Sequence, residues 1–150
     1  MQNYTFKGQS LPLSAVRAAL PNSIETLRTF RPYKGREGLE LKADINLLDG
    51  SLDFSRLALN ESCPALRIAA YKSPFHGLVC SFSYQTKTKG SDLYTSSSFI
   101  LFEDYLDSLP AIKARNTAKN LLSVWHAGLD ALPSQLEKVF AFYNIVDSSI

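Results

Sequence analysis

The sequence predicts an α+β fold, in which an antiparallel sheet of about five to seven strands, built from hairpins, carries helices on one face. Segments in which apolar and polar residues alternate cluster in the middle of the chain, whereas the strongest helical periodicity lies at its C-terminal end. The 150 residues contain no internal repeat and no long polar linker. We therefore expect residues 1–150 to form a single α+β domain.

The N-terminal part is expected to contain a short strand at residues 3–7 and then a short helix. Pro12 suits the start of a helix, and residues 13–20 form two turns that Pro21 is expected to end. The next run, residues 24–31, fits either a helix or a strand, and its threonine and phenylalanine content favours a strand.

A first hairpin is predicted between residues 39 and 59. Apolar and polar residues alternate from 39 to 48, and Asp49-Gly50 is a preferred pair for a tight turn. The chain then returns through residues 52–59, where a break in the alternation predicts a bulge near Arg56.

A second, longer hairpin is predicted after the short apolar run Ala65–Tyr71 and a loop at residues 73–77. Alternation from residue 78 to 87 predicts one strand, and residues 93–102 form the returning strand. The tip at residues 88–92 is polar and contains Gly90. Because the distal half of this hairpin has few apolar residues to bury, we expect it to project.

Two antiparallel helices are predicted at the C-terminal end, packed on one face of the sheet. Residues 108–132 have an apolar stripe that includes Trp125, and the carboxylates of Glu103, Asp104 and Asp107 would favour the start of this helix. Pro133 is expected to end it. A capping-box pattern at residues 134–137 then starts a second helix that runs to about residue 146.

No catalytic, metal-binding or cofactor-binding motif is recognised. The chain lacks a nucleophile elbow, a phosphate-binding loop and a dinucleotide fingerprint. Glu40 and Lys42 have the spacing of a nuclease motif, but no aspartate precedes them. The four Cys and His residues are badly spaced for zinc. We therefore expect no catalytic residues, no metal and no cofactor, although an enzyme with an unrecognised site remains one alternative.

The N-terminus has no basic segment followed by an apolar run, and no stretch is long and apolar enough to span a membrane. These features predict a cytoplasmic protein without membrane association. In that compartment Cys63 and Cys80 are expected to be reduced thiols.

Charge is distributed in blocks of alternating sign, although the net charge is only +2. Residues 1–36 carry six basic side chains and one acidic one, and residues 62–91 carry four basic side chains and no acidic one. Arg115 and Lys119 add a basic face to the predicted main helix. The residues expected to contact a partner are Arg28, Phe30, Arg31, Tyr33, Lys34, Arg36, Tyr84, Lys87, Lys89, Arg115 and Lys119.

Interleaved basic and aromatic side chains fit two kinds of partner. Tyrosine, phenylalanine and arginine anchor protein interfaces, whereas aromatic rings among cations also stack on the bases of nucleic acid. A solvated surface paired with the neighbouring acidic blocks is the third explanation. We expect a non-catalytic binding protein of inhibitor, immunity or adaptor type that docks on a protein or nucleoprotein partner, with a nucleic-acid-binding protein as the alternative.

Overall fold

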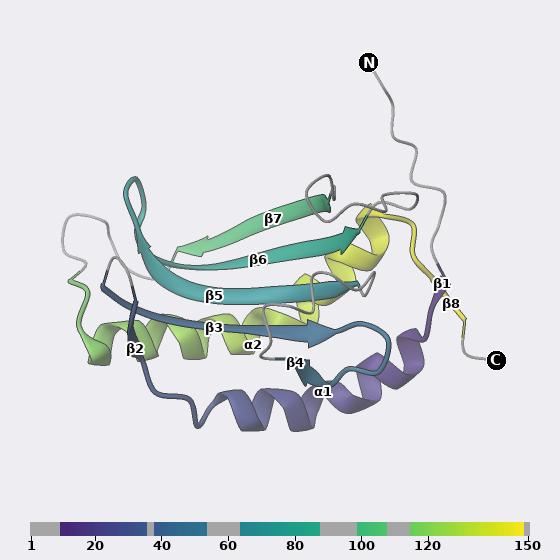
Figure 1. Ribbon diagram of the computed structural model, residues 1–150, viewed down its shortest axis with the longest axis horizontal. Helices are drawn as coiled ribbons and strands as arrows, with labels where there is room; N and C mark the ends of the chain where they lie inside the picture. Colours follow the sequence, from purple (N-terminus) through teal and green to yellow (C-terminus); the bar gives the residue numbers. More distant parts are fainter. Residues whose placement is uncertain (1–9, 36–37, 54–63, 88–98, 108–114, 149–150) are drawn as a thin grey trace, which may run out of the picture.

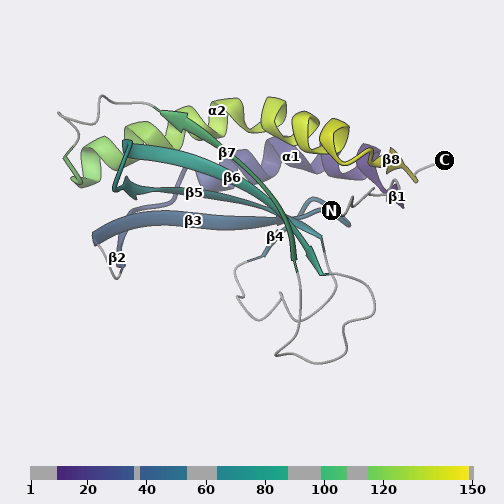
Figure 2. The ribbon, with the colours of Figure 1, turned by 90° about the horizontal axis from the view of Figure 1, so that it is seen from above.

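The computed structural model describes residues 10–35, 38–53, 64–87, 99–107 and 115–148. In this part of the chain a twisted antiparallel sheet carries two long helices on one face (Figures 1 and 2). The predicted α+β class and the antiparallel sheet are confirmed. Neither described helix combines the length and apolar character needed to cross a lipid bilayer.

Five strands lie in the order β2-β3-β5-β6-β7, and every neighbouring pair is antiparallel. They are β2 (Tyr33–Gly35), β3 (Gly38–Asn46), β5 (Ala65–Ser73), β6 (Gly77–Lys87) and β7 (Phe99–Asp107). A two-residue strand, β4 (Leu52–Asp53), also pairs with β3 beyond the Asp49-Gly50 turn. The alternation predicted strands at the positions of β3 and β6, and the apolar run at 65–71 lies in β5.

The N-terminal helix, α1 (Leu13–Leu27), is longer than the sequence predicted, because it continues through Pro21. Residues 24–27 are therefore helical, and the preference for a strand there was wrong. The extra turns place Leu27 in the core, fully buried, and the buried Ser23 Oγ donates to the carbonyl of Gly50 at 2.9 Å. These contacts offset the backbone hydrogen bond that proline removes.

The C-terminal end contains one helix, α2 (Ala118–Phe142), where two were predicted. It begins after Thr117, whose side chain accepts a hydrogen bond from the Asn120 N–H at 3.3 Å. Pro133 lies inside the helix, between the fully buried Leu132 and Leu136. Apolar packing on both sides of Pro133 stabilises a single continuous helix, and this outweighs the tendency of proline to end a helix.

The returning strand of the second hairpin, β7, ends five residues later than predicted, at Asp107. Glu103, Asp104 and Asp107 therefore belong to a strand, and the prediction that they precede a helix was wrong. They pair in register with Ser83, Phe82 and Val79 of β6. The strand at 3–7, the bulge near Arg56, the hairpin tip, Cys63 and the proposed helix start at 108–114 lie outside the described residues.

A short parallel pair, β1 (Ser10–Leu11) with β8 (Val146–Asp147), was not predicted. It places the Asp147 carboxylate at the start of α1, where it accepts from the Leu13 N–H at 3.1 Å and the Ser14 Oγ at 2.8 Å. A side chain more than 130 positions away thus satisfies donors that would otherwise be unpaired at the helix start.

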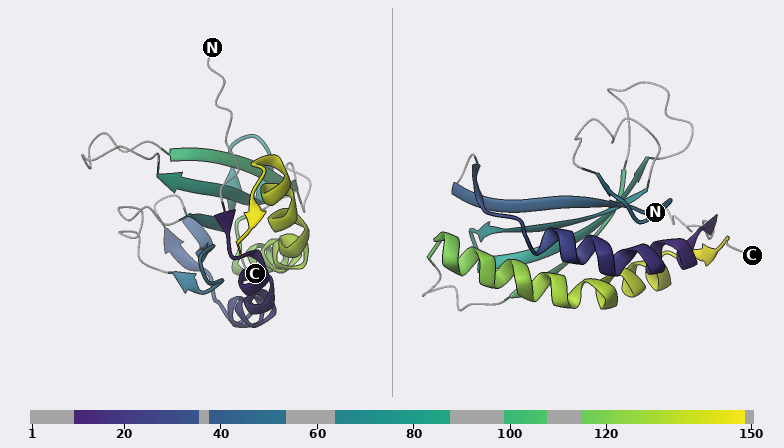
Figure 3. Two further views of the ribbon diagram at one scale, coloured as in Figure 1. Left: turned by 90° about the vertical axis from the view of Figure 1, so that its right-hand side faces the viewer. Right: turned by 90° about the horizontal axis from the view of Figure 1, so that it is seen from below.

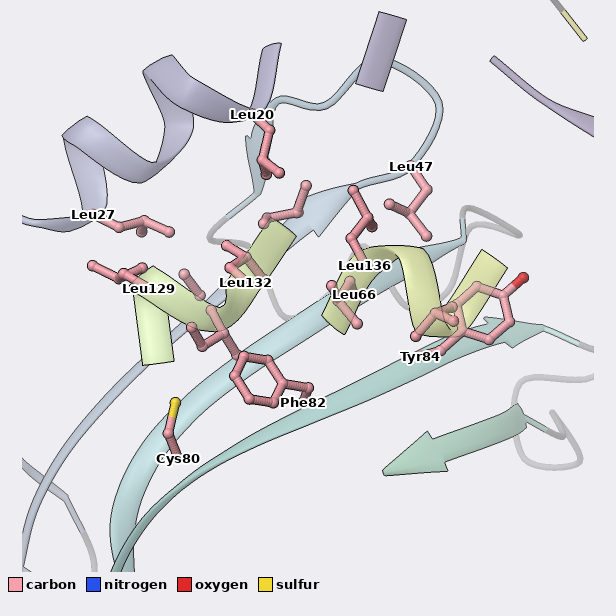
Figure 4. Packing of buried hydrophobic residues seen from close by; sticks show 14 of the residues in the cluster. Leu20, Leu27, Leu47, Leu66, Cys80, Phe82, Tyr84, Leu129, Leu132 and Leu136 are labelled. Carbon is pink, nitrogen blue, oxygen red and sulfur yellow. The ribbon is translucent and has the colours of Figure 1, made fainter. Parts of the chain in front are cut away.

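The core lies between the sheet and the two helices, which run antiparallel to each other (Figure 3). Figure 4 shows Leu129, Leu132 and Leu136 of α2 between α1 and the strands that carry Leu66 and Phe82. Trp125 is fully buried and its Nε1 donates to the Leu27 carbonyl at 2.9 Å. At Gly128 the helix approaches β6 so closely that a Cβ would lie 2.3 Å from Cys80 Sγ.

Candidate partner-binding surface

Two basic segments that are distant in the sequence lie at one end of the molecule, on the left of Figure 1. The chain leaves α1 and enters β2 there, and α2 begins there. Gly38 and Asn116 mark the contact, since a Cβ on Gly38 would lie 2.5 Å from Asn116 Nδ2. We call this surface the basic end. Its described members are Arg28, Arg31, Tyr33, Lys34, Arg115 and Lys119.

The two arginines that follow α1 are partly engaged by the protein itself. Arg28 Nη2 lies 2.6 Å from Asp130 Oδ1, and this pair is exposed. Arg31 Nη1 donates to the carbonyls of Thr29 at 3.3 Å and Phe30 at 3.4 Å. Carbonyl contacts orient the Arg31 guanidinium without neutralising it, so its charge remains available to an anionic group.

The remaining cations of the basic end, Lys34, Arg115 and Lys119, are exposed. In the described part of the chain no carboxylate lies within 4.0 Å of any of them. In the strand register the acidic residue closest to Lys34 is Glu40, which pairs with the neighbouring Tyr33 across β2 and β3. Lys119 also lies in the first turn of α2, where the helix dipole is positive and a cation is unfavourable.

The three aromatic residues of the predicted surface have different environments. Tyr33 is 44% exposed on β2. Phe30 is partly buried, and its ring stacks on Trp125 with the ring centroids 6.1 Å apart. Tyr84 is only 1% exposed and its ring lies 4.7 Å from that of Tyr143, so its side chain belongs to the core.

The burial of Tyr84 follows from the alternation of β6. Tyr84 shares a face with Cys80 and Phe82, and this face packs against α2. The sequence contained this signal, since the same alternation placed Tyr84 with the apolar residues of the strand. The other face carries Ser81 and Ser83.

Lys87, in the second basic block at residues 62–91, is not part of the basic end. The β6 strand starts on the side of the basic end and runs to the opposite side in Figure 1, so the backbone of Lys87 lies roughly 33 Å from Gly77 at about 3.3 Å per residue. Arg36 and Lys89 lie outside the described residues. The predicted contact residues therefore do not form one continuous surface.

The described cysteine and the histidine of the β5–β6 turn do not form a recognisable catalytic arrangement. Burial raises the pKa of the Cys80 thiol to about 12, which leaves it protonated and unreactive at neutral pH. His76 is exposed on the turn between β5 and β6, with its ring centroid 5.9 Å from that of Tyr105. No group of three or more described His, Cys, Asp or Glu residues is arranged to hold a metal ion.

Glu103 and Asp104 of β7 have separate contacts. Glu103 Oε1 accepts from Tyr105 Oη at 3.2 Å, whereas Asp104 Oδ2 accepts from Lys138 Nζ of α2. The hydrogen bond from Lys138 lowers the pKa of Asp104, and Tyr105 has its pKa raised to about 12, mainly by a hydrogen bond with Tyr71. Adjacent residues of a strand point to opposite faces, so Glu103 and Asp104 cannot share one ligand.

Comparisons with known proteins identify no relative of this chain. No protein-family model, no curated protein and no solved structure matches it. A functional proposal therefore depends on the residues and their geometry alone.

Proposed function

We propose that this is a non-catalytic binding protein that docks on an acidic surface of a protein or nucleoprotein partner through the basic end. The observation that carries the proposal is the meeting of two basic segments, residues 28–34 and 115–119, at the contact between Gly38 and Asn116. Unpaired cations concentrated on one surface steer an acidic partner and select against a basic one.

The position of Lys119 supports the proposal. A cation in the first turn of a helix costs about 0.3–1 kcal/mol relative to a neutral or acidic residue. The described residues supply no carboxylate that would offset this cost. An acidic group of a partner would do so in the complex.

A protein surface fits the basic end better than single-stranded nucleic acid does. Binding to bases relies on exposed aromatic rings. Of the predicted aromatic contacts, Tyr84 is in the core and Phe30 stacks on Trp125, which leaves Tyr33 as the exposed ring. Tyr33 beside Lys34 is the observation that keeps nucleic acid as the second candidate.

The test is an affinity pull-down from a native lysate with the intact chain and with two variants of equal net charge. K34Q/K119Q removes two positive charges from the basic end. The control, A18E/S134E, adds two negative charges at exposed helix positions nearer the other end of the molecule. Thermal unfolding of all three proteins checks that each is folded.

We expect a protein that survives nuclease treatment to be recovered with the intact chain and with A18E/S134E. Its recovery with K34Q/K119Q should fall about tenfold, the effect of losing roughly 1.4 kcal/mol of binding free energy. Recovery of nucleic acid alone, lost as salt is raised, would contradict the proposal and support the second candidate. An equal loss with both variants would exclude the basic end as the contact surface.

A further inference from the structure

The outer edge of β7 is a second surface suited to recognition, and its charge is opposite to that of the basic end. The strand pairs with β6 over nine positions, from Val79 with Asp107 to Lys87 with Phe99. It is the last strand in the order, and no described strand lies on its other side (Figure 3, left). Such an edge presents unpaired backbone N–H and C=O groups that can pair with another chain.

The hydrogen bond at Tyr105 shows which residues of β7 face outward. In an antiparallel ladder, alternate residues direct their backbone groups toward the partner strand and away from it. The Tyr105 N–H donates to Asp104 Oδ1 at 2.9 Å, so it belongs to the outward set. Residues 99, 101 and 103 belong to the same set, because they alternate with the residues that face β6.

The composition of β7 selects the charge of an incoming strand. Residues 99–107, FILFEDYLD, contain three carboxylates and no cation. They also lack lysine and proline, the residues that commonly protect an edge from pairing. Pairing with a second copy of β7 would bring like charges together, whereas a segment that carries lysine or arginine would be attracted.

The α2 residues beside β7 favour a hydrogen-bond donor on the inner face of an added strand. Gln135 is only 8% exposed and interacts with Asp104. Its Oε1 is buried and has no hydrogen-bond partner among the described residues. A buried acceptor without a donor is costly, and a hydroxyl-bearing side chain arriving next to Asp104 would remove that cost.

We propose that the outer edge of β7 binds an extended segment of a partner protein as an added strand, with lysine or arginine facing Glu103 and threonine or serine facing α2. Main-chain hydrogen bonds at 99, 101 and 103 supply the affinity, and the carboxylates supply the specificity. This inference does not depend on the basic end, because the two surfaces share no residue.

The test uses a fluorescein-labelled octapeptide of alternating lysine and threonine, measured by fluorescence anisotropy against the intact chain. Two further peptides carry N-methyl groups, one on two lysines and the other on two threonines. Alternate residues donate from opposite edges of a strand, so only one of these peptides loses the donors that face β7. A peptide with glutamate in place of lysine controls for charge.

We expect one N-methylated peptide to bind at least about tenfold more weakly than the parent and the other to bind like it, since two backbone hydrogen bonds are lost in only one of them. The glutamate peptide should not bind. In the protein, Glu103→Gln should weaken binding of the parent peptide. Glu25 is an exposed carboxylate of α1, and Glu25→Gln should leave this binding unchanged.

Three results would overturn the proposal. The first is an equal effect of both N-methylated peptides, which would indicate attraction by charge without strand pairing. The second is no binding at about 1 mM peptide. The third is a stable dimer of the chain that Glu103→Gln strengthens, which would make a second copy the occupant of the edge. None of these results depends on the outcome of the pull-down that tests the basic end.

Discussion

The two halves of α2 differ in how their charges are used. Asp130, Glu137 and Lys138 in the C-terminal half form ion pairs with Arg28, Arg17 and Asp104. In the N-terminal half, Lys119 has no acidic partner within 4.0 Å among the described residues. One half therefore uses charge to hold neighbouring elements, whereas the other leaves charge available to a ligand.

The two halves of α2 are also held in place by different kinds of contact. Arg17 and Glu137 join α1 to α2, and Lys138 joins α2 to β7 through Asp104. The N-terminal half is held by Trp125, which is fully buried, bonds to the Leu27 carbonyl and stacks on Phe30. In the N-terminal half of α2, apolar packing takes the place of the ion pairs that hold the C-terminal half.

The largest effect is expected from Trp125→Ala, which removes the anchor of the N-terminal half. We expect the free energy of unfolding to fall by about 3–5 kcal/mol, because a buried aromatic ring is lost and a cavity remains. Urea unfolding followed by circular dichroism measures it. Trp125→Phe keeps most of the apolar volume and should cost less. A loss below about 1 kcal/mol for the alanine variant would contradict this account of the anchor.

A smaller effect is expected from Glu137→Gln, which breaks the pair with Arg17. Because both side chains are half exposed, the cost at neutral pH is about 0.2–1 kcal/mol. The hydrogen bond from Arg17 lowers the pKa of Glu137 from its ordinary value of 4.5. The stabilisation is therefore fully present above pH 4.5 and is lost as the pH falls through the lowered pKa.

Urea unfolding of the intact chain, of Glu137→Gln and of Arg17→Gln at neutral and acidic pH measures this difference. The difference in the free energy of unfolding between the intact chain and Glu137→Gln should disappear at acidic pH. Glu25→Gln changes an exposed carboxylate of α1 and serves as the control. A gap that persists when Glu137 is protonated would mean that the pair does not account for the effect.

An effect of similar size, with the opposite sign, is expected from Lys119→Glu. A carboxylate in the first turn of α2 complements the helix dipole, so the free energy of unfolding should rise by about 0.3–1 kcal/mol. Binding of an acidic partner should weaken at the same time. The free energy of unfolding of Lys119→Gln should lie between those of the intact chain and Lys119→Glu. Lower stability of Lys119→Glu would indicate that Lys119 has a structural role.

The strands that the sequence located best are those with the clearest alternation of apolar and polar residues. Residues 39–48 and 78–87 alternate clearly, and the structure places β3 and β6 there. The boundary of β7 was missed because acidic residues before a helical pattern suit a helix start as well as a strand. Pairing with β6, which brings Ser83 opposite Glu103, resolves that ambiguity.

The candidate surfaces were less accessible to sequence reasoning. The basic composition of residues 28–36 and the spacing of Arg115 and Lys119 were visible, but their proximity depends on the contact between Gly38 and Asn116. Tyr84 was assigned to the surface by residue type although its alternation placed it in the core. The open edge of β7 had no sequence signal, because the order of strands is a property of the whole sheet.

The sequence by itself determined the α+β class, the alternation of the principal strands and the apolar stripe around Trp125, because these depend on local periodicity. Only the tertiary structure decided that both helices continue through Pro21 and Pro133. Proline costs about 3 kcal/mol in an isolated helix. The core that Leu20, Leu27, Leu132 and Leu136 form with the sheet, a sum of contacts between distant segments, exceeds that cost.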